Sequence, residues 1–260
     1  MFDEGKGPPL VVIPGVQGRW EWFRPGLLEL SRHCRTISYS LCGDFRSGLK
    51  YDRTLGFDNY VRQLDGVLDR AGLDRAALCG ISYGGFIAVR YAALRPDRVT
   101  AVALASSPGP GWTPNEQQRR YLARPWTSAP SFLMSSPGRL FPEIYAAYDS
   151  WPERVNCAFR HAARALWHPM NPALMAERVA VQQAMDFEPD CCAVRAPTLV
   201  ISGEDHLDRI VPADVTRRYQ SLIPDARYEK LDRTGHLGVI TRPRRFAELV
   251  GEFVNDAVNT

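Results

Sequence analysis

The sequence predicts an α/β protein with a mostly parallel central sheet, helices on both faces of the sheet and a helical insertion. Short apolar runs alternate with helix-like segments up to Ala105, and the alternation resumes at Ala196. This alternation is typical of βαβ units, whose strands run parallel. Between the two parts, the stretch 110–191 is helix-forming and interrupted by prolines. We interpret it as an insertion into the sheet pattern.

The length of the chain favours one domain. A chain of 260 residues can bury one sizeable core, and α/β domains of this length commonly remain single units. We therefore expect one domain with a core of residues 1–109 and 192–260 and a helical cap at about 110–191. The hydrophobic share of 45% and the charged share of 23% are ordinary for a globular protein.

The first part of the chain contains four strand candidates and three helix candidates. Apolar runs bounded by turn formers predict the strands, which we expect at 10–13, 35–41, 76–80 and 99–105. Apolar residues at helical spacing predict the helices, which we expect at about 25–33, 58–72 and 86–94. Each strand is followed by a loop or a helix, as a parallel sheet requires.

The insertion is rich in aromatic side chains. It holds four of the six tryptophans, namely Trp112, Trp126, Trp151 and Trp167. Packing within the insertion explains any single one of them, but together they predict an apolar roof over a pocket. After the insertion we expect strands at 196–202 and 226–231 and helices at 213–222 and 243–254.

Charge and cysteine patterns exclude several classes of protein. The net charge is +3, and the basic residues are scattered, so we expect no nucleic-acid partner. No apolar run is long enough to span a membrane, and the polar start, 1–9, lacks the apolar core of a signal peptide. We expect a cytoplasmic protein. The six cysteines lack metal-binding spacing, so we expect free thiols, no metal and no cofactor. A homodimer is compatible with the sequence.

The segment Gly80–Gly85 carries the pattern G-x-S-x-G between a predicted strand and a predicted helix. In a nucleophile elbow, a strained turn of this kind lifts the serine oxygen above the sheet edge. Glycines on both sides of Ser82 allow the strand and the helix to approach closely. The pattern also occurs in ordinary turns, so its meaning depends on whether a base, an acid and an oxyanion hole follow in order.

A base and an acid do follow at the ends of later strands. His236 comes directly after the last predicted strand, which gives the order serine, acid, histidine. A serine hydroxyl needs such a base, and the base needs a carboxylate that fixes its tautomer. The loop after strand 196–202 offers Asp208 and, as the alternative acid, Asp205; Asp232 is a weaker third choice.

On these residues the chain resembles the α/β-hydrolase superfamily, in its cap-bearing branch of serine esterases, lactonases and carbon–carbon bond hydrolases. The likeness lies in Ile13–Gly15, Gly80–Gly85, Asp208–Pro212 and Gly235–His236. The family usually has a histidine at the position of Pro14.

A second difference from the family lies in the acid loop. A glycine normally stands three residues before the acid, whereas Gly203 stands five before Asp208. This apparent insertion keeps Asp205 open as the acid.

The resemblance implies an acyl-transfer mechanism. Ser82 would be the nucleophile, His236 the base and Asp208 the acid, and the N–H groups of Val16 and Tyr83 would form the oxyanion hole. We expect a carboxylesterase-like hydrolase for a small or medium apolar carboxylic ester. The alternatives are a lactonase or a carbon–carbon bond hydrolase with the same triad, or a non-catalytic ligand-binding or regulatory protein on this scaffold.

Overall fold

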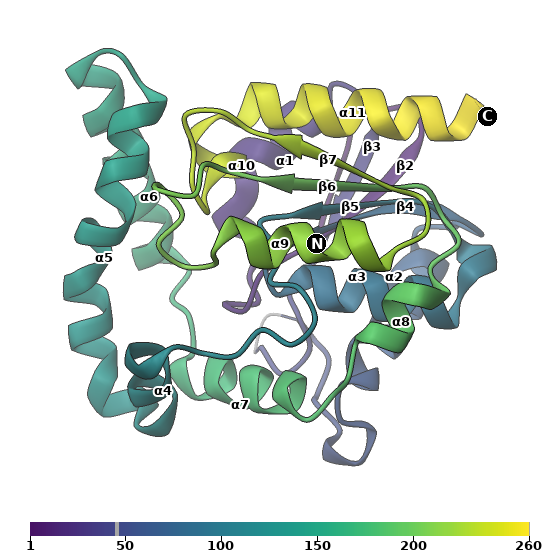
Figure 1. Cartoon of the computed structure of the whole chain (residues 1–260), viewed down its shortest axis with the longest axis horizontal. Coiled ribbons are helices and arrows are strands. Elements are labelled where there is room, and N and C mark those ends of the chain that lie inside the picture. The colour runs from purple at the N-terminus through teal and green to yellow at the C-terminus, as the bar shows by residue number, and fades with distance from the viewer. Residues whose placement is uncertain (45–46, 260) are drawn as a thin grey trace.

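The computed structural model describes residues 1–44 and 47–259. In these residues the strands form one seven-stranded sheet in the order β1-β3-β2-β4-β5-β6-β7 (Figure 1). Neighbouring strands are parallel, except that β1 is antiparallel to β3. The predicted mostly parallel sheet is therefore confirmed. The strands are β1 (Phe2–Glu4), β2 (Pro9–Ile13), β3 (Arg35–Ser38), β4 (Ala76–Ile81), β5 (Val99–Ala105), β6 (Thr198–Ser202) and β7 (Ala226–Lys230).

Helices cover both faces of the sheet, as predicted. One face packs against α1 (Arg24–Leu30), α10 (Gly238–Thr241) and α11 (Pro243–Asn259). The other packs against α2 (Asp58–Arg70), α3 (Gly84–Leu94), α8 (Glu188–Ala193) and α9 (Ala213–Leu222). Strand β2 shows how one sequence serves both layers. Leu10 and Val12 belong to the apolar cluster on the face covered by α1, α10 and α11. Val11 and Ile13 belong to the cluster on the opposite face, covered by α2, α3, α8 and α9. Alternating side chains of a strand point to opposite faces, so a buried parallel strand is apolar throughout.

The edge strand β1 was not predicted from the sequence. It is only three residues long, and two of them are the exposed acids Asp3 and Glu4. Its contacts explain why it forms: Phe2 is buried against the sheet, and Asp3 forms an ion pair with Arg35 of β3 at 2.9 Å. A short strand with charged side chains also protects a sheet edge from pairing with other chains.

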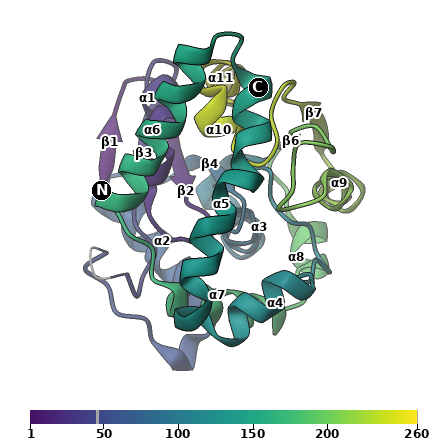
Figure 2. The ribbon, with the colours of Figure 1, turned by 90° about the vertical axis from the view of Figure 1, so that its left-hand side faces the viewer.

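Of the five helices between β5 and β6, α8 packs on the sheet and the other four stand beyond the carboxyl ends of the strands (Figure 1). We call them the inserted helices; they are α4 (Glu116–Ala123), α5 (Pro125–Ala147), α6 (Trp151–Trp167) and α7 (Pro172–Gln183). Figure 2 looks onto them and shows α5 running across the front of the molecule. Prolines open α5, α6 and α7, where a missing N–H costs nothing. Helix α5 nevertheless continues through three internal prolines, Pro130, Pro137 and Pro142.

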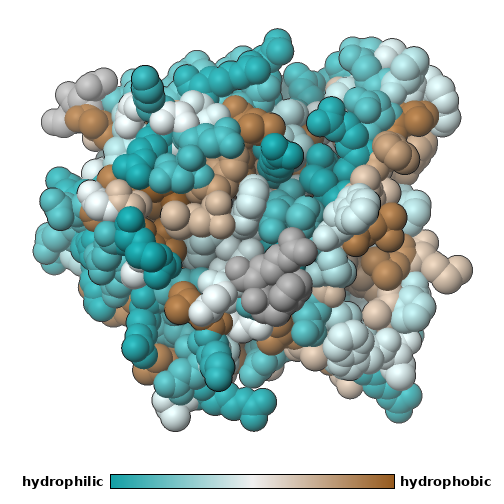
Figure 3. Space-filling view, turned by 180° about the vertical axis from the view of Figure 1, so that it is seen from behind, coloured by the Kyte–Doolittle hydropathy of each residue, from teal (hydrophilic) through white to brown (hydrophobic). Residues whose placement is uncertain are grey.

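The inserted helices carry much exposed apolar surface. Brown and tan side chains gather on the right of the molecule in Figure 3, where these helices lie when it is seen from behind. The most exposed apolar side chains belong to α5 and α6: Trp126, Met134, Phe159, Leu166 and Trp167. Single exposed apolar residues are normal on a protein surface, but such a concentration is typical of binding or contact surfaces.

Candidate active site

Ser82 lies at a sharp turn between β4 and α3. Its φ angle is +52°, a left-handed conformation that a serine rarely adopts. Two backbone hydrogen bonds hold the turn: the Ser82 N–H donates to the Ala105 carbonyl at 2.9 Å, and the Gly85 N–H donates to the Ser82 carbonyl at 2.9 Å. Such a conformation costs about 1 to 3 kcal/mol and persists only where the surroundings enforce it. The strained turn expected of a nucleophile elbow is therefore present.

The glycines around Ser82 are required by close backbone contacts. A Cβ added to Gly80 would lie 2.5 Å from the Gly84 carbonyl oxygen and 2.6 Å from the Gly85 α-carbon. A Cβ on Gly84 would overlap the carbonyl oxygen of Ile13. These distances confirm the interpretation that the glycines let the strand and the helix approach each other.

The Gly80→Ala variant is expected to lose about 1 to 3 kcal/mol of unfolding free energy, because its methyl group would meet backbone atoms that cannot move aside. A matched control is Gly138→Ala, in the interior of α5, where an added Cβ meets nothing within 4 Å. This control should be neutral or gain about 0.5 to 1 kcal/mol from the higher helix propensity of alanine. Urea denaturation of both variants measures the difference. Equal stability of Gly80→Ala and wild type would contradict the packing argument.

The structure brings Ser82, His236 and Asp208 together at the carboxyl ends of three strands. The distance from His236 Nε2 to Ser82 Oγ is 3.0 Å, and the distance from His236 Nδ1 to Asp208 Oδ2 is 3.2 Å. Both are hydrogen-bond distances. They fit a tautomer in which Nδ1–H donates to Asp208 and Nε2 accepts the hydroxyl proton of Ser82. The three side chains thus form a continuous hydrogen-bonded chain.

The pKa of His236 is raised by this arrangement. Burial alone would lower the pKa of the imidazole, but the Asp208 carboxylate raises it through its charge and its hydrogen bond. The carboxylate of Glu143 raises the pKa further. The site therefore stabilises the imidazolium form that a general base adopts after taking a proton.

Of the two candidate acids, only Asp208 contacts His236. Its side chain is buried, and its Oδ1 accepts the N–H groups of Ile210 at 2.9 Å and Val211 at 2.8 Å. Asp205 is exposed to solvent.

A turn in the loop after β6 allows Asp208 to contact His236 although the loop is longer than in the family. The carbonyl oxygen of Glu204 accepts the N–H groups of Leu207 and Asp208, both at 3.0 Å. Compared with the family, this loop has two extra residues between Gly203 and Asp208. They lie in this turn, and Asp205 within it is exposed to solvent. The third candidate, Asp232, is exposed and forms an ion pair with Lys230.

The predicted oxyanion donors are the N–H groups of Val16, in the loop after β2, and Tyr83, directly after Ser82. The Gly15 carbonyl accepts the Gly18 N–H at 2.8 Å, and because C=O and N–H of a trans peptide point in opposite directions, the Val16 N–H is directed away from that bond. The Ser82 carbonyl, bonded to Gly85, orients the Tyr83 N–H in the same way. Within residues 1–44 and 47–259, neither N–H has a protein acceptor.

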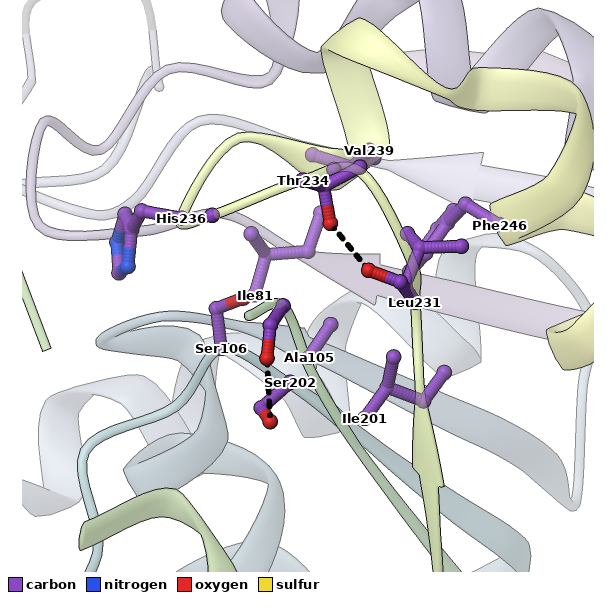
Figure 4. Close-up of a pocket in the computed structure, with 13 residues that line it drawn as sticks. Ile81, Ala105, Ser106, Ile201, Ser202, Leu231, Thr234, His236, Val239 and Phe246 are labelled. Carbon is purple, nitrogen blue, oxygen red and sulfur yellow. Dashed lines mark hydrogen bonds between the residues drawn. The ribbon is translucent and has the colours of Figure 1, made fainter. Parts of the chain in front are cut away.

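A crevice beside His236 has mostly apolar walls. It lies between the ends of β5, β6 and β7 and helices α10 and α11, and Figure 4 shows the residues that line it. Two of its hydroxyl groups have partners in the protein: Thr234 donates to the Leu231 carbonyl at 2.8 Å, and Ser202 lies 2.7 Å from the Tyr228 hydroxyl. Ser106 and His236 are the other polar residues that line it.

Glu143 of α5 contacts the histidine loop, a role the sequence did not suggest. Both of its carboxylate oxygens lie 3.0 Å from the Leu237 nitrogen, next to His236, and Oε1 accepts the Thr241 hydroxyl at 2.9 Å. Burial raises the pKa of the Glu143 carboxyl, while the hydrogen bonds from Leu237 and Thr241 lower it. A single acid among apolar neighbours in α5 was the available signal, but its partners are 94 and 98 residues away in the chain.

The Glu143→Ala variant is expected to lose about 1 to 3 kcal/mol of unfolding free energy, because the Leu237 N–H is left without its acceptor. Thermal or urea denaturation measures the loss. The control is Glu116→Ala on α4, an exposed acid whose removal should change stability by no more than about 0.5 kcal/mol. If the two variants are equally stable, Glu143 does not anchor the inserted helices to the histidine loop.

Other kinds of site are not found in the part of the chain that the structure describes. There, no group of three or more His, Cys, Asp or Glu side chains is arranged to hold a metal ion. Over the same residues, no helix is both long enough and apolar enough to cross a membrane. The cysteines are free thiols, as expected.

Comparison with known proteins identifies the family. A model of the alpha/beta hydrolase family matches residues 10–249. The 2-hydroxymuconate semialdehyde hydrolase of Pseudomonas sp. (strain CF600) is 30% identical to the chain, and the match covers 99% of this chain and 90% of that protein. The 2-hydroxy-6-oxo-2,4-heptadienoate hydrolase of Pseudomonas putida is 28% identical, with 98% and 91% covered.

Among solved structures, the enol-lactonase from Burkholderia xenovorans LB400 is similar, with a TM-score of 0.78. It is 22% identical, and the match covers 98% of this chain and 95% of that one. The family model and the curated relatives extend over nearly the whole sequence, and the resemblance seen in the sequence motifs is confirmed. The chain belongs to the alpha/beta hydrolase family.

Proposed function

We propose that the protein is a serine hydrolase that cleaves a small or medium apolar carboxylic ester through an acyl-enzyme. The observation that carries this proposal is the hydrogen-bonded chain from Ser82 through His236 to Asp208. Ser82 Oγ attacks the carbonyl carbon while His236 Nε2 takes its proton. The protonated imidazole then donates that proton to the leaving alkoxide, and the acyl group stays on the serine.

Water completes the reaction in the second half. His236 takes a proton from water, the resulting hydroxide attacks the acyl carbon, and the proton returns to Ser82 Oγ as the carboxylic acid leaves. Asp208 holds the imidazole throughout. Its Oδ1 is occupied by two backbone N–H groups, which leaves Oδ2 aimed at His236 Nδ1.

The N–H groups of Val16 and Tyr83 are the proposed donors to the tetrahedral oxyanion. Tyr83 directly precedes α3, so the positive end of the helix dipole also faces the developing charge. In a protease, loss of one such donor costs about 2.7 to 4 kcal/mol of transition-state stabilisation. The backbone supplies both donors, so Pro14 in place of the usual histidine does not remove either.

The inserted helices are the proposed cap over this site. They stand at the end of the sheet where Ser82 lies, and Glu143 ties α5 to the loop of His236. Many of their apolar and aromatic side chains are exposed, and we propose that part of this surface contacts an apolar substrate. We propose that the cap comprises residues at about 110–191, with the sheet and its flanking helices as the core of the same domain.

A second candidate is hydrolysis of a lactone or a carbon–carbon bond with the same triad. The observation that favours it is the similarity to two relatives named as hydrolases of 2-hydroxymuconate semialdehyde and 2-hydroxy-6-oxo-2,4-heptadienoate, over nearly the full length of this chain. Attack by the same serine on a ketone carbonyl or a lactone carbonyl uses the same base and oxyanion hole.

A substrate panel tests the proposal. Purified protein is assayed with p-nitrophenyl acetate and butyrate, an enol-lactone and the two unsaturated acids named above. We expect turnover of the p-nitrophenyl esters. The highest kcat/KM on an unsaturated acid or a lactone would replace the ester proposal with the second candidate. Absence of all turnover, together with absence of fluorophosphonate labelling in folded protein, would favour a ligand-binding or regulatory role.

A further inference from the structure

Arg178 of α7 is hydrogen-bonded to both residues that supply the proposed oxyanion donors. Its Nη1 donates to the Val16 carbonyl at 2.9 Å, and its own carbonyl accepts the Tyr83 hydroxyl at 2.9 Å. Arg178 and Tyr83 are 3% and 4% exposed. One buried residue of the inserted helices therefore connects the loop after β2 with the nucleophile elbow.

The hydrogen bond from Arg178 to the Val16 carbonyl restrains the turn of residues 15–18, which follows β2. Because the Gly18 N–H donates to the Gly15 carbonyl, Val16 and Gln17 are the central residues of a four-residue turn. The peptide between the two central residues has two common orientations, which distinguish type I from type II turns. Arg178 binds the oxygen of that peptide and thereby favours one orientation. The proposed donor N–H of Val16 belongs to the preceding peptide, whose direction the Gly15–Gly18 bond fixes. Arg178 therefore acts on this donor by holding in place the turn that carries it.

The loop has room for the guanidinium because of Gly18. Its φ angle is +74°, and a Cβ at this position would overlap Arg178 Nη1. The second terminal nitrogen, Nη2, lies 3.4 Å from the Cys42 carbonyl oxygen. The guanidinium thus lies between the loops that follow β2 and β3, and carbonyl groups of both accept from it.

The charge of Arg178 is not neutralised by a neighbouring acid. Within the described ranges 1–44 and 47–259, no carboxylate lies within 4.0 Å of its guanidinium, and its acceptors are neutral carbonyls. Burial of an unneutralised cation is unfavourable. The formation of negative charge next to Val16 in the transition state would therefore be favoured by this cation.

We propose that Arg178 is a positioning residue that sets the oxyanion hole from the inserted helices. This inference rests on the proposed function of Ser82 and His236. The Arg178→Met variant keeps much of the apolar stem but removes the charge and the donors. It should lower kcat by about 100-fold with little change in KM, since the hole contacts the transition state more strongly than the substrate.

The inhibition constant of a transition-state analogue distinguishes a change in the oxyanion hole from a general loss of stability. An aryl trifluoromethyl ketone accepts Ser82 Oγ at its carbonyl carbon; the C=O π electrons become the oxyanion, and His236 takes the serine proton. Across Arg178→Met and Arg178→Lys, the Ki of this ketone should rise by the same factor by which kcat/KM falls. Lysine keeps one donor and the charge, so it should recover part of the loss. Titration with a fluorophosphonate gives the concentration of active enzyme.

The matched control is Gln182→Met. Gln182 lies one helical turn after Arg178, is equally buried and bonds to Gln183. It should leave kcat and Ki close to wild type. Near-wild-type kcat and Ki in Arg178→Met would overturn the proposal, as would a raised KM with unchanged kcat, because that result indicates substrate binding.

An NMR measurement separates this inference from the proposed function. In 1H–15N spectra of labelled protein without substrate, Arg178→Met should shift or broaden the amide signals of Val16 and of its turn, because the Val16 carbonyl loses its side-chain donor, and Gln182→Met should not. Unchanged signals would contradict the positioning role whatever the activity. If the wild type hydrolyses nothing in the panel but the signals move, the proposed function fails while the effect of Arg178 on the loop stands.

Discussion

Replacement of Ser82 by alanine is expected to lower kcat for ester hydrolysis by about 10⁶-fold, as loss of the nucleophile does in a serine protease. The attacking oxygen is absent, so no acyl-enzyme forms, and His236 has no proton to take. Steady-state assays with p-nitrophenyl butyrate measure the loss. The His236→Ala variant should lose about as much, because nucleophile and base act as a unit.

A serine and a histidine outside the candidate active site serve as controls for these variants. Ser221 is an exposed serine of α9, and His206 is an exposed histidine in the loop that follows β6. Ser221→Ala and His206→Ala should keep kcat close to wild type. If Ser82→Ala retains full activity under the same conditions, the hydrolysis uses another nucleophile.

The Asp208→Asn variant is expected to lower kcat by about 10⁴-fold, since an amide at this position favours the wrong tautomer of the histidine. It should also move the pH profile. The base must be neutral to accept a proton, so wild-type kcat/KM falls as pH drops through the raised pKa of His236. Without the carboxylate that raises this pKa, the acid limb of the profile should move to lower pH. Measurement of kcat/KM as a function of pH shows both effects.

The control for this variant is Asp205→Asn. Asp205 lies in the same loop but is exposed. Its replacement should change neither kcat nor the pH at which kcat/KM falls on the acid side. The opposite result, with a large loss in Asp205→Asn and none in Asp208→Asn, would show that Asp205 is the functional acid in solution.

Much of the architecture follows from the sequence because its signals are local. Strands 10–13 and 99–105 are continuous apolar runs, and a parallel sheet buried on both faces requires such runs. The elbow was also predictable, since its glycines and serine are adjacent in the chain. Once the strands are parallel, residues that follow them meet at one edge, and this geometry places Ser82 near His236.

The remaining features depend on contacts between distant residues. The residues that follow Asp208 favoured it as the acid, but its contact with His236, 28 residues away in the chain, is seen only in the structure. Arg178 and Glu143 lie in helices whose periodicity predicts a helix but not what it packs against. Strand β1 was missed because three mostly polar residues form a strand only when β3 is beside them.

Covalent labelling shows whether Ser82 is an activated nucleophile, because it does not depend on the choice of substrate. Folded wild-type protein is treated with a fluorophosphonate, digested and analysed by peptide mass spectrometry. We expect one adduct, on the peptide that contains Ser82, which is absent in Ser82→Ala and formed far more slowly in His236→Ala. An adduct on a different residue, or none on folded protein, would show that Ser82 is not an activated nucleophile.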